Sequence, residues 1–424
     1  MASRKWFYIL LTVCLTACGG EPTTSTVRTS VQKLSKSPKR GVAFNFSISE
    51  DLPVLSPYIS WDYNWGNTSS ELSALWFDTN EMDYCPMCWN GNYSADAIRA
   101  YVAAHPATKY LLAFNEPNLT DQANMTPAQA AALWPAVVAL AEELNLKLIS
   151  PAMNYGTLAG YSDPIKWLDE FFEQPNVSLD DVYAISIHCY MGSAGAMAAF
   201  VQKFAKYNKP IWLTEFCAWE NVNSVEAQMD YMSAALNYLE TTELVERYAW
   251  FIPRWSKHNV SPYMELLTSG VESSLTDAGK VYCYFTNMSS SEYLETNRFI
   301  YAGEYCTLSN TNSTLRPCAD AEAVLKAGKE GLMVSGLHTG NALTYHLAVP
   351  QFTNTITIRY ASYIASIMEI YVDGQLANYL DMPKTGSYDN WTEAMTTAGI
   401  KAGYHEIELK MNSGSAYISG FLLQ

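Results

Sequence analysis

Two glutamates that each follow a short apolar run are the residues of this chain best suited to chemistry. Tyr110–Phe114 is followed by Asn115-Glu116-Pro117, and Pro210–Leu213 is followed by Thr214-Glu215. Each run is typical of a buried strand, and the proline ends the first one because it has no N–H to offer a sheet. Two carboxyl groups at the carboxyl ends of parallel strands predict an acid/base pair at one rim of a barrel.

The elements that must position these glutamates alternate along residues 40–253. Short apolar runs are separated by amphipathic segments, of which the clearest is Thr126–Asn145, with Thr126 as its cap and a proline in its first turn. Eight such runs predict an α/β fold, a (β/α)8 TIM barrel, with Glu116 and Glu215 ending the fourth and seventh strands. The expected strands are Gly41–Phe46, Ile59–Trp65, Leu72–Phe77, Tyr110–Asn115, Lys147–Met153, Tyr183–Tyr190, Pro210–Glu215 and Arg247–Pro253.

The pattern changes in the last third of the chain. From Phe299 onward the helical period disappears, and segments of period 2 are separated by turns such as Asp373-Gly374. This predicts a C-terminal all-β sandwich, so we expect a barrel over residues 39–290 and a sandwich over 296–424. Its expected strands are Ala342–Val349, Thr355–Tyr360, Ser366–Val372, Ala377–Leu380, Gly403–Met411 and Ala416–Leu422.

The N-terminus has the pattern of an export signal. Arg4 and Lys5 precede the apolar run Trp6–Leu15, which is too short for an ordinary membrane span. The following Thr-Ala-Cys18 resembles a bacterial lipobox, which predicts a signal peptide over residues 1–18 and lipidation of Cys18; ordinary cleavage near Ala17 is the alternative. Residues 19–38 are rich in Ser and Thr and predict a flexible tether. We therefore expect an exported lipoprotein on the periplasmic face or the cell surface, held to the membrane by its lipid alone.

Composition and charge exclude several kinds of partner. The formal net charge of −16 argues against nucleic acid and anionic lipid. It suits a neutral polysaccharide, although solubility alone would also explain it. No nucleotide-binding loop, nucleophile elbow or cluster of metal ligands is apparent, so we expect no cofactor and no metal. A monomer is the expected state.

Seven cysteines remain beyond the N-terminal segment, in a chain whose expected export permits disulfides. Cys85-Pro-Met-Cys88 is compatible with a redox pair or half a zinc site, but a short structural disulfide is the favoured interpretation because no second ligand pair accompanies it. Cys306 and Cys318 are candidates for a second loop disulfide. The odd number leaves at least one free thiol, expected at Cys189 or Cys217.

The motifs together resemble glycoside hydrolase family 128, the Asl1-like glycosyl hydrolase catalytic core. They are Lys39-Arg-Gly-Val-Ala-Phe-Asn45, Leu55-Ser-Pro-Tyr-Ile-Ser-Trp-Asp-Tyr-Asn-Trp-Gly66, Phe114-Asn-Glu-Pro-Asn118, Ser150-Pro-Ala-Met153, Ile187-His-Cys-Tyr190 and Trp212-Leu-Thr-Glu-Phe216. The likeness covers about residues 39–255, in a family chiefly of β-1,3-glucanases.

The resemblance implies a role for each polar residue at the rim. Glu116 would be the general acid/base and Glu215 the nucleophile of a retaining mechanism, and their mutual repulsion would raise one pKa. Asn115 would hydrogen-bond the sugar 2-hydroxyl, Tyr190 would donate to Glu215, and His188 would contact the substrate or the acid/base. For sugar stacking we select Trp65, Trp219 and Trp250, since an indole face suits a pyranose, with core packing as the alternative.

The C-terminal part resembles a carbohydrate-binding module of the family 6/35 type. Gly303-Glu-Tyr-Cys-Thr-Leu308, Ile358-Arg-Tyr-Ala-Ser362 and Thr385-Gly-Ser-Tyr-Asp-Asn-Trp391 are among the segments that support it. Trp391 would stack on a sugar, with Tyr360 or Tyr363 facing it. The final strand lacks the usual Asn or Asp, which puts the family's calcium in doubt, because Glu304 alone is a poor ligand set. A sandwich that only supports the barrel is the alternative.

These observations predict a retaining glycoside hydrolase acting on a laminarin-type β-1,3-glucan, with Glu116 and Glu215 as its catalytic residues. A different class remains open, a surface glycan-binding lipoprotein with little or no hydrolysis. A glycosidase on another β-glycan is also open, since strand-end carboxylates do not encode linkage. Endo or exo attack depends on loops that the sequence does not place.

Overall fold

The computed structural model describes residues 30–31, 36–220, 222–255, 263–270, 272–286, 292–309 and 313–424. The expected signal peptide, Cys18 and most of the tether lie outside these ranges. Two tether residues form a strand, β1 (Ser30–Val31), which pairs in parallel with β10 (Glu292–Glu295). Within the described ranges, no helix combines the length and the apolar character that crossing a membrane requires.

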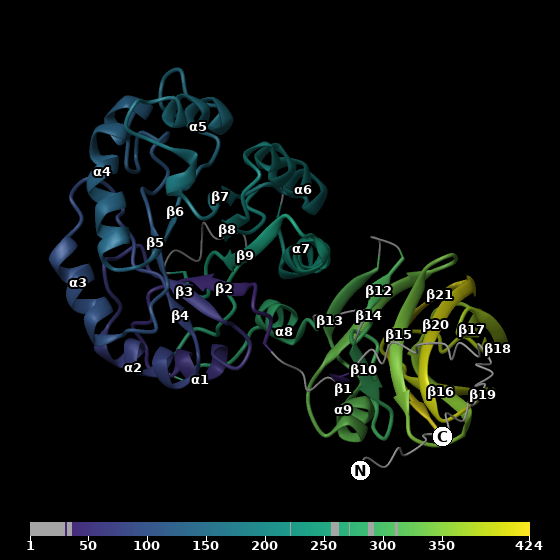
Figure 1. Cartoon of the computed structure of the whole chain (residues 1–424). Helices are drawn as coiled ribbons and strands as arrows, with labels where there is room; N and C mark the ends of the chain where they lie inside the picture. The colour runs from purple at the N-terminus through teal and green to yellow at the C-terminus, as the bar shows by residue number, and fades with distance from the viewer. Residues whose placement is uncertain are drawn as a thin grey trace, which may run out of the picture.

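Eight parallel strands make up the centre of the N-terminal α/β domain (Figure 1). Six pair in the order β4-β3-β2-β9-β8-β7, and β5 pairs with β6. Parallel bridges from Met87 to Leu112 and from Ile149 to Ala184 join the two groups, so the strands form a ring. The strands are β2 (Arg40–Ala43), β3 (Trp61–Tyr63), β4 (Asp83–Tyr84), β5 (Tyr110–Leu112), β6 (Lys147–Ile149), β7 (Ile185–Cys189), β8 (Ile211–Phe216) and β9 (Val245–Trp250).

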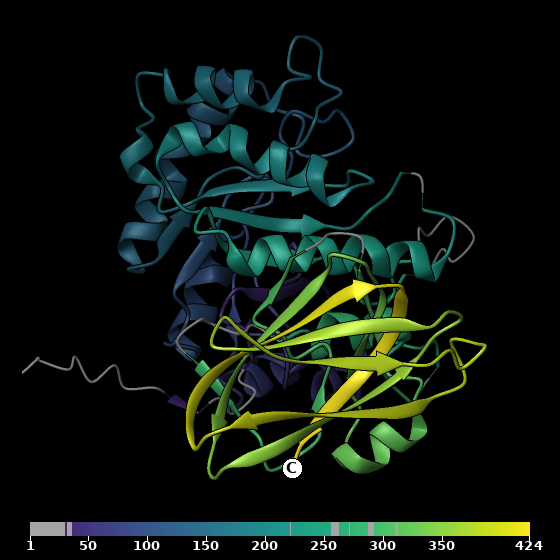
Figure 2. The same cartoon turned by 90° about the vertical axis from the view of Figure 1, so that its right-hand side faces the viewer.

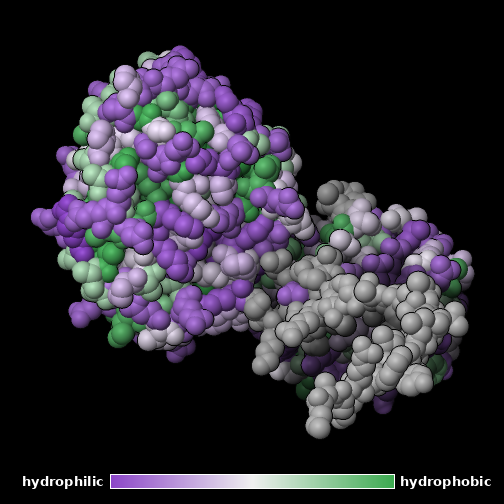
Figure 3. All heavy atoms as spheres, in the orientation of Figure 1, coloured by the Kyte–Doolittle hydropathy of each residue, from purple (hydrophilic) through white to green (hydrophobic). Residues whose placement is uncertain are grey.

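Helices follow the strands and surround the ring (Figures 1 and 2). Helix α4 (Pro127–Glu143) begins at its expected cap, where the Thr126 hydroxyl accepts from the Gln129 N–H. The face of this domain seen in Figure 3 is mostly hydrophilic with small hydrophobic patches. The helices are α1 (Asp51–Leu55), α2 (Glu71–Thr79), α3 (Ala95–Ala104), α4 (Pro127–Glu143), α5 (Pro164–Phe172), α6 (Ala194–Lys203), α7 (Val225–Thr241) and α8 (Asp277–Tyr284), with 3-10 turns at Leu179–Asp181 and Phe204–Tyr207.

One expected strand is wrong. Leu72–Phe77 lies inside helix α2, and the third strand is β4, which begins six residues later at Asp83. The Ser70 hydroxyl caps the helix by accepting from the Ser73 N–H. A six-residue apolar run fits a strand and a short helix equally well, so the cap and the ring geometry decide between them.

A layer of aromatic side chains fills the ring below the strand ends. Trp61, Tyr63, Tyr110 and Trp212 are buried in one cluster, with small residues such as Ala43 and Ala249 opposite them. Gly41 permits this packing, because a Cβ there would lie 2.5 Å from the Trp61 indole. The interior of the ring is therefore closely packed, and this aromatic layer fixes the positions of the strand ends above it.

A buried arginine joins the first and last parts of the ring. Arg40 of β2 forms a 2.9 Å ion pair with Glu240 of α7 and donates to the Tyr248 hydroxyl of β9 at 3.1 Å. It also donates to the carbonyls of Cys283 and Phe285, at 3.2 and 3.0 Å. Arg40 and Glu240 are thus paired with each other and further hydrogen-bonded, which the burial of two charges requires.

The C-terminal domain is all-β, in two packed sheets, so the predicted order of an α/β domain and then an all-β domain is confirmed (Figures 1 and 2). One sheet has the order β1-β10-β15-β20-β17-β18 with β12 beside β15, and the other β13-β14-β21-β16-β19 with β11 beside β21. The strands are β11 (Ile300–Tyr301), β12 (Thr307–Leu308), β13 (Thr314–Pro317), β14 (Leu332–His338), β15 (Ala342–Val349), β16 (Thr353–Ala361), β17 (Ser366–Val372), β18 (Gln375–Met382), β19 (Thr392–Ile400), β20 (Gly403–Ser413) and β21 (Ser415–Leu423).

Some elements of this domain were not expected from the sequence. Ala321–Ala327 forms helix α9, which Asp320 caps, although no helix was expected beyond residue 299. Strands β14 and β19 were also missed. The less exposed positions of β19 carry small or polar residues, Ala394, Thr396 and Ala398, so its period-2 signal is weak.

Helices α7 and α8 are the side of the α/β domain that meets the sandwich (Figure 2). The Leu315 N–H of β13 donates to the Ser233 hydroxyl of α7 at 3.1 Å, and Tyr305 exchanges hydrogen bonds with Asn237 of α7. Specific hydrogen bonds thus connect the α/β domain to the sandwich across their packed surfaces.

The expected disulfides are wrong, because all seven described cysteines are free. Cys85 packs inside the ring, and Cys88 packs in the core outside it, so their side chains lie on opposite faces of one segment. Cys306 packs against the main core and Cys318 against the small cluster around Phe299. Cys189 and Cys217, expected as free thiols, are buried and free.

Replacing Glu240 by Gln should destabilise the α/β domain by about 3 kcal/mol, because Arg40 would remain buried without its counter-charge. Urea unfolding followed by tryptophan fluorescence measures the change. Glu143→Gln is the matched control, since its partner Arg99 lies at the surface and the midpoint should not move. Equal midpoints for both variants would contradict this account of the buried pair.

Candidate active site

A cavity of about 840 Å³ opens at the carboxyl ends of the strands. Both glutamates that the sequence singled out line it. The residues around it come from the end of β8 and from the segments after β3, β4, β5, β6, β7, β8 and β9: Trp65, Trp89, Asn115, Glu116, Leu119, Asp121, Gln122, Asn154, Tyr190, Glu215, Trp219, Glu220, Phe251, Ile252 and Trp255.

Two of these residues have left-handed backbone conformations. Glu116 has φ of +44° and Trp65 has φ of +62°, values that residues with a side chain rarely adopt. The Glu116 N–H still donates to the Ala152 carbonyl, at 3.0 Å, so the neighbouring segment holds the turn in place. Rare backbone conformations cluster at functional sites, where surrounding structure over-determines them.

Register shifts also aim side chains into the cavity. The pairing of β7 with β8 shifts between Ile187 and His188, and that of β8 with β9 shifts between Leu213 and Phe216. Such irregularities re-aim a side chain beside a site. These shifts turn the side chains of both His188 and Glu215 toward the site. Strict alternation of side chains along the strands would not have turned both of them there.

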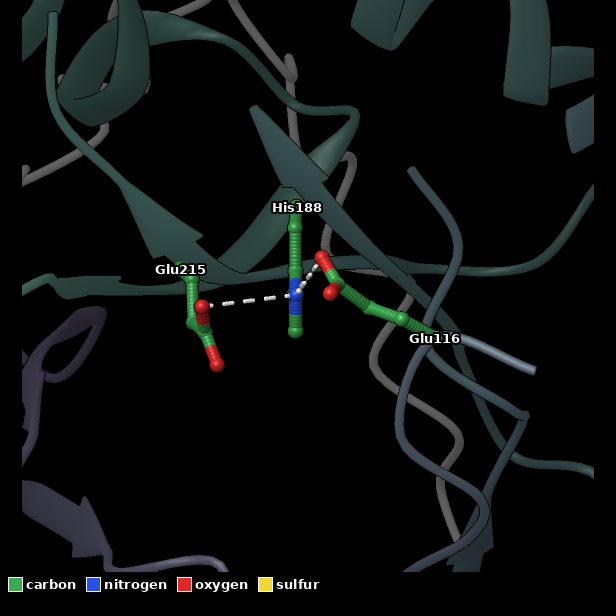
Figure 4. A group of neighbouring side chains, drawn as sticks. All are labelled: Glu116, His188 and Glu215. Atoms are coloured by element: carbon green, nitrogen blue, oxygen red, sulfur yellow. Dashed lines mark hydrogen bonds and ion pairs between the residues drawn. The ribbon is translucent and has the colours of Figure 1, made fainter. Parts of the chain in front are cut away.

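His188 lies between the two glutamates (Figure 4). Its Nδ1 is 2.8 Å from Glu116 Oε1 and 3.5 Å from Glu215 Oε2. Ligand atoms of the three residues lie within 4.8 Å of one another, and all three side chains are buried. In the described part of the chain these are the residues whose donor set could hold a divalent cation.

Glu215 is surrounded by hydrogen-bond donors. Its Oε1 accepts from the Tyr63 hydroxyl at 2.8 Å and from the Trp65 indole N–H at 2.7 Å, and its Oε2 accepts from the Tyr190 hydroxyl. Tyr190 thus makes the contact that the resemblance implied. Donors to an ionised carboxylate stabilise the charge and fix its orientation.

Glu116 has different partners. Its Oε1 accepts from the Asn154 amide at 3.1 Å and contacts His188. Burial favours the neutral acid, but the charge and hydrogen bond of His188 outweigh it and lower the pKa of Glu116. The expectation that repulsion from the second glutamate raises this pKa is therefore wrong for the site without substrate, because the attraction of the His188 imidazole acts in the opposite direction.

Asn115 lies beside Glu116 and is almost fully buried. Its amide N–H donates to Gln122 at 3.1 Å, and its Oδ1 has no partner in the described part of the chain. The side chain lines the cavity, so this oxygen is a candidate acceptor for a ligand hydroxyl.

The expected tryptophans divide into two groups. Trp65 and Trp219 line the cavity. Trp250 does not, so its assignment to sugar binding is wrong: it is fully buried against Phe216 and Tyr282, and its indole N–H donates to the Met264 carbonyl. Its neighbours on β9 point into the ring, so period 2 turns Trp250 outward.

Several lining residues were missed. Asn154 lines the cavity, and the buried Tyr63 contacts Glu215 from below it. Both follow the pattern of polar residues at strand ends, which was the signal available in Tyr63-Asn-Trp and Met153-Asn154. Trp89 and Phe251 line the cavity as well, and only the tertiary structure distinguishes them from core aromatics.

The expected sugar-binding residues of the sandwich also divide. Tyr360 is buried and donates to the Pro383 carbonyl, so it cannot stack on a sugar and that assignment is wrong. Tyr363 is exposed and lies edge-on to Tyr388, which stacks on Tyr417 with ring centres 4.1 Å apart. Trp391 is half-buried.

Glu304 has protein partners in place of a cation. Its Oε2 forms a 2.7 Å ion pair with Arg298 and accepts from the Tyr301 N–H at 3.0 Å. Both contacts satisfy a carboxylate that is nearly buried.

Comparison with known families agrees with this geometry. Residues 41–282 match the model of the glycosyl hydrolase catalytic core, and residues 316–421 match the carbohydrate binding module of family 6. The first match covers more than half of the chain. The protein is therefore a glycoside hydrolase with a C-terminal carbohydrate-binding module.

Comparison with solved structures identifies the glycoside hydrolase family more closely. The chain is 36% identical to a family 128 (subgroup II) endo-β-1,3-glucanase from Pseudomonas viridiflava, over 59% of this chain and 98% of that one, with a TM-score of 0.54. It is 35% identical to a subgroup II endo-β-1,3-glucanase from Sorangium cellulosum, over 58% and 97%, with a TM-score of 0.52. The chain belongs to glycoside hydrolase family 128, which confirms the interpretation from the motifs.

A curated relative is more distant. Alkali-sensitive linkage protein 1 of Schizosaccharomyces pombe is 27% identical over 234 residues. The match covers 52% of this chain, and the chain spans only 39% of the length of that protein.

The division among the tryptophans can be tested by binding. Trp219→Ala should weaken the binding of a glucan oligosaccharide about tenfold, because loss of one aromatic contact costs about 1.4 kcal/mol. Isothermal titration calorimetry measures the affinity. Trp250→Phe should bind as the parent protein does, since Trp250 lies outside the cavity. The reverse order of the two effects would restore Trp250 as a sugar contact.

Proposed function

We propose that this protein is a retaining glycoside hydrolase that cleaves β-1,3-linked glucan on a (β/α)8 barrel of the TIM type. The observation that carries the mechanism is the closeness of Glu116 and Glu215, whose nearest oxygens lie within 4.8 Å. Retaining enzymes hold their carboxyl groups about 5–5.5 Å apart, and inverting enzymes about 6.5–9.5 Å, to admit a water. The substrate is suggested by the two family 128 glucanases that the chain resembles.

In the first step Glu215 attacks the anomeric carbon while Glu116 protonates the leaving oxygen. The hydroxyls of Tyr63 and Tyr190 and the Trp65 indole would keep Glu215 ionised and aimed. In the second step Glu116, now a carboxylate, removes a proton from water, which displaces Glu215 and keeps the configuration of the sugar.

The substrate would lie along aromatic and polar walls. The free Oδ1 of Asn115 would accept from the 2-hydroxyl, a bond that strengthens as the oxocarbenium ion forms. Trp65, Trp219 and Trp255 offer ring faces for pyranose units. In the sandwich, Trp391 and Tyr363 remain our candidates for holding the polymer.

Laminarin hydrolysis tests the catalytic assignment. Glu215→Ala and Glu116→Ala should each lower kcat by at least roughly a thousandfold, since each removes a group that acts on the reacting atoms. Reducing-sugar release measures the rate, and proton NMR during the first turnovers should show the β-anomer. An initial α-anomer would exclude retention.

Other outcomes of that experiment separate the alternatives. Binding of laminarin without release of sugar by the wild-type protein would favour a surface glycan-binding lipoprotein. Release from a different β-glycan only would keep the chemistry and change the substrate.

We also propose that Cys18 is lipidated and anchors the enzyme to a membrane, on the strength of the Leu15-Thr-Ala-Cys18 pattern. In a bacterial host the wild-type protein should appear in the membrane fraction and incorporate labelled fatty acid. Cys18→Ser should lose the label and become soluble after export. A membrane-bound Cys18→Ser protein would refute the lipid anchor.

A further inference from the structure

His188 makes contacts that the double-displacement mechanism does not use. Its side chain is fully buried, and its Nδ1 faces both carboxyl groups, 2.8 Å from Glu116 and 3.5 Å from Glu215 (Figure 4). When both carboxyl groups are ionised, Nδ1 carries a proton, because a bare lone pair would face the acceptor oxygen of Glu116 at 2.8 Å. Its Nε2 has no partner in the described part of the chain.

Among the described residues, His188 supplies the positive charge that the two buried carboxylates need. Two carboxylates buried within 4.8 Å of each other repel and lose hydration. In the described part of the chain, no lysine or arginine forms an ion pair with either of them. Among the described residues, the imidazole of His188 is the titratable cation that contacts both carboxyl groups.

The two tyrosines that contact Glu215 stay neutral, and Asp121 and Glu220 are further carboxyl groups that line the same cavity. The hydroxyl of Tyr63, from β3, and that of Tyr190, beyond β7, both donate to Glu215. Burial first, and then the charge of Glu215, raises the pKa of each tyrosine well above its ordinary value. Neither tyrosine can supply or take the catalytic proton near neutral pH.

We infer that His188 is a positioning residue that holds the catalytic proton between the two glutamates before substrate binds, and releases it to Glu116 when the glucan enters. This inference rests on the proposed function. In the empty site the imidazolium and two carboxylates sum to one negative charge. The raised pKa of His188, in which the attraction of Glu215 and Glu116 outweighs burial, agrees with this state.

The transfer balances without another reactant. The Nδ1–H bond of His188 breaks, an O–H bond forms on Oε1 of Glu116 across 2.8 Å, and the electron pair stays on Nδ1. The imidazole and Glu116 become neutral together, and Glu215 keeps its charge as nucleophile. Entry of a sugar removes water and favours the neutral pair over the charged one. Glu116 then protonates the leaving oxygen.

The pH profile of His188→Asn tests the inference. The Asn amide can still donate near the position of Nδ1 but cannot store a proton. The basic limb of kcat/KM, which reports the free enzyme, should move to lower pH by about one unit or more, a tenfold loss above the limb. His105→Asn is the matched control, because His105 contacts Asp78 at 2.7 Å on the barrel surface, and its profile should match the wild type.

An equal loss of rate at every pH in His188→Asn would overturn the inference and leave His188 a structural role. Proton NMR of histidine-labelled protein gives a second measurement that does not depend on activity. With six histidines, the His188 signal can be assigned from its absence in His188→Asn, or by elimination if that variant fails to fold.

The His188 signal should titrate above the ordinary histidine value of 6.5 in the wild type, and at lower pH in Glu215→Gln, which lacks the attracting charge. A His188 that stays neutral from pH 5 to 8 would also overturn the inference. A wild-type protein that hydrolyses no glucan would instead refute the proposed function, and the titration would still locate the proton.

Discussion

Two carboxyl groups taken out of water and held within 4.8 Å of each other are the constraint on which the rest of the site depends. Their repulsion and lost hydration must be offset by groups that the fold supplies. Three neutral donors converge on Glu215, and the imidazole of His188 faces both acids. The two glutamates thereby differ in surroundings, which is the physical basis for giving them different roles.

Holding this arrangement requires a rigid support with local irregularities. The aromatic layer inside the ring gives this support, and the buried Arg40–Glu240 pair joins strand β2 to helix α7. The irregularities lie at the rim, as left-handed residues at Trp65 and Glu116 and as register shifts beside His188 and Glu215. The regular strands thus lie below the site, and the rare backbone conformations lie at the rim, where functional sites commonly concentrate them.

The sandwich extends the catalytic domain through polar pairs on α7 and α8. Its core takes up Tyr360, which leaves Tyr363 and Trp391 as the outer aromatics of the expected sugar site. Tyr388 stacks on Tyr417, a pairing that would alter any sugar platform there. The family match therefore agrees with the all-β fold of this module. It does not by itself place the sugar-binding residues, since Tyr360 lies in the core.

The sequence by itself determined the domain order, most strand and helix positions, and the two glutamates at strand ends, because strand ends, caps and prolines act over a few neighbouring residues. Asn115, His188 and Tyr190 followed from the resemblance of the motifs to the family. Only the tertiary structure decided that Leu72–Phe77 is a helix, that Trp250 and Tyr360 face the core, and that Cys85 and Cys88 point apart. It also decided that His188 lowers the pKa of Glu116. Which face of a strand is buried, and which charge meets which, depends on segments far apart in the chain, and no local pattern contains that information.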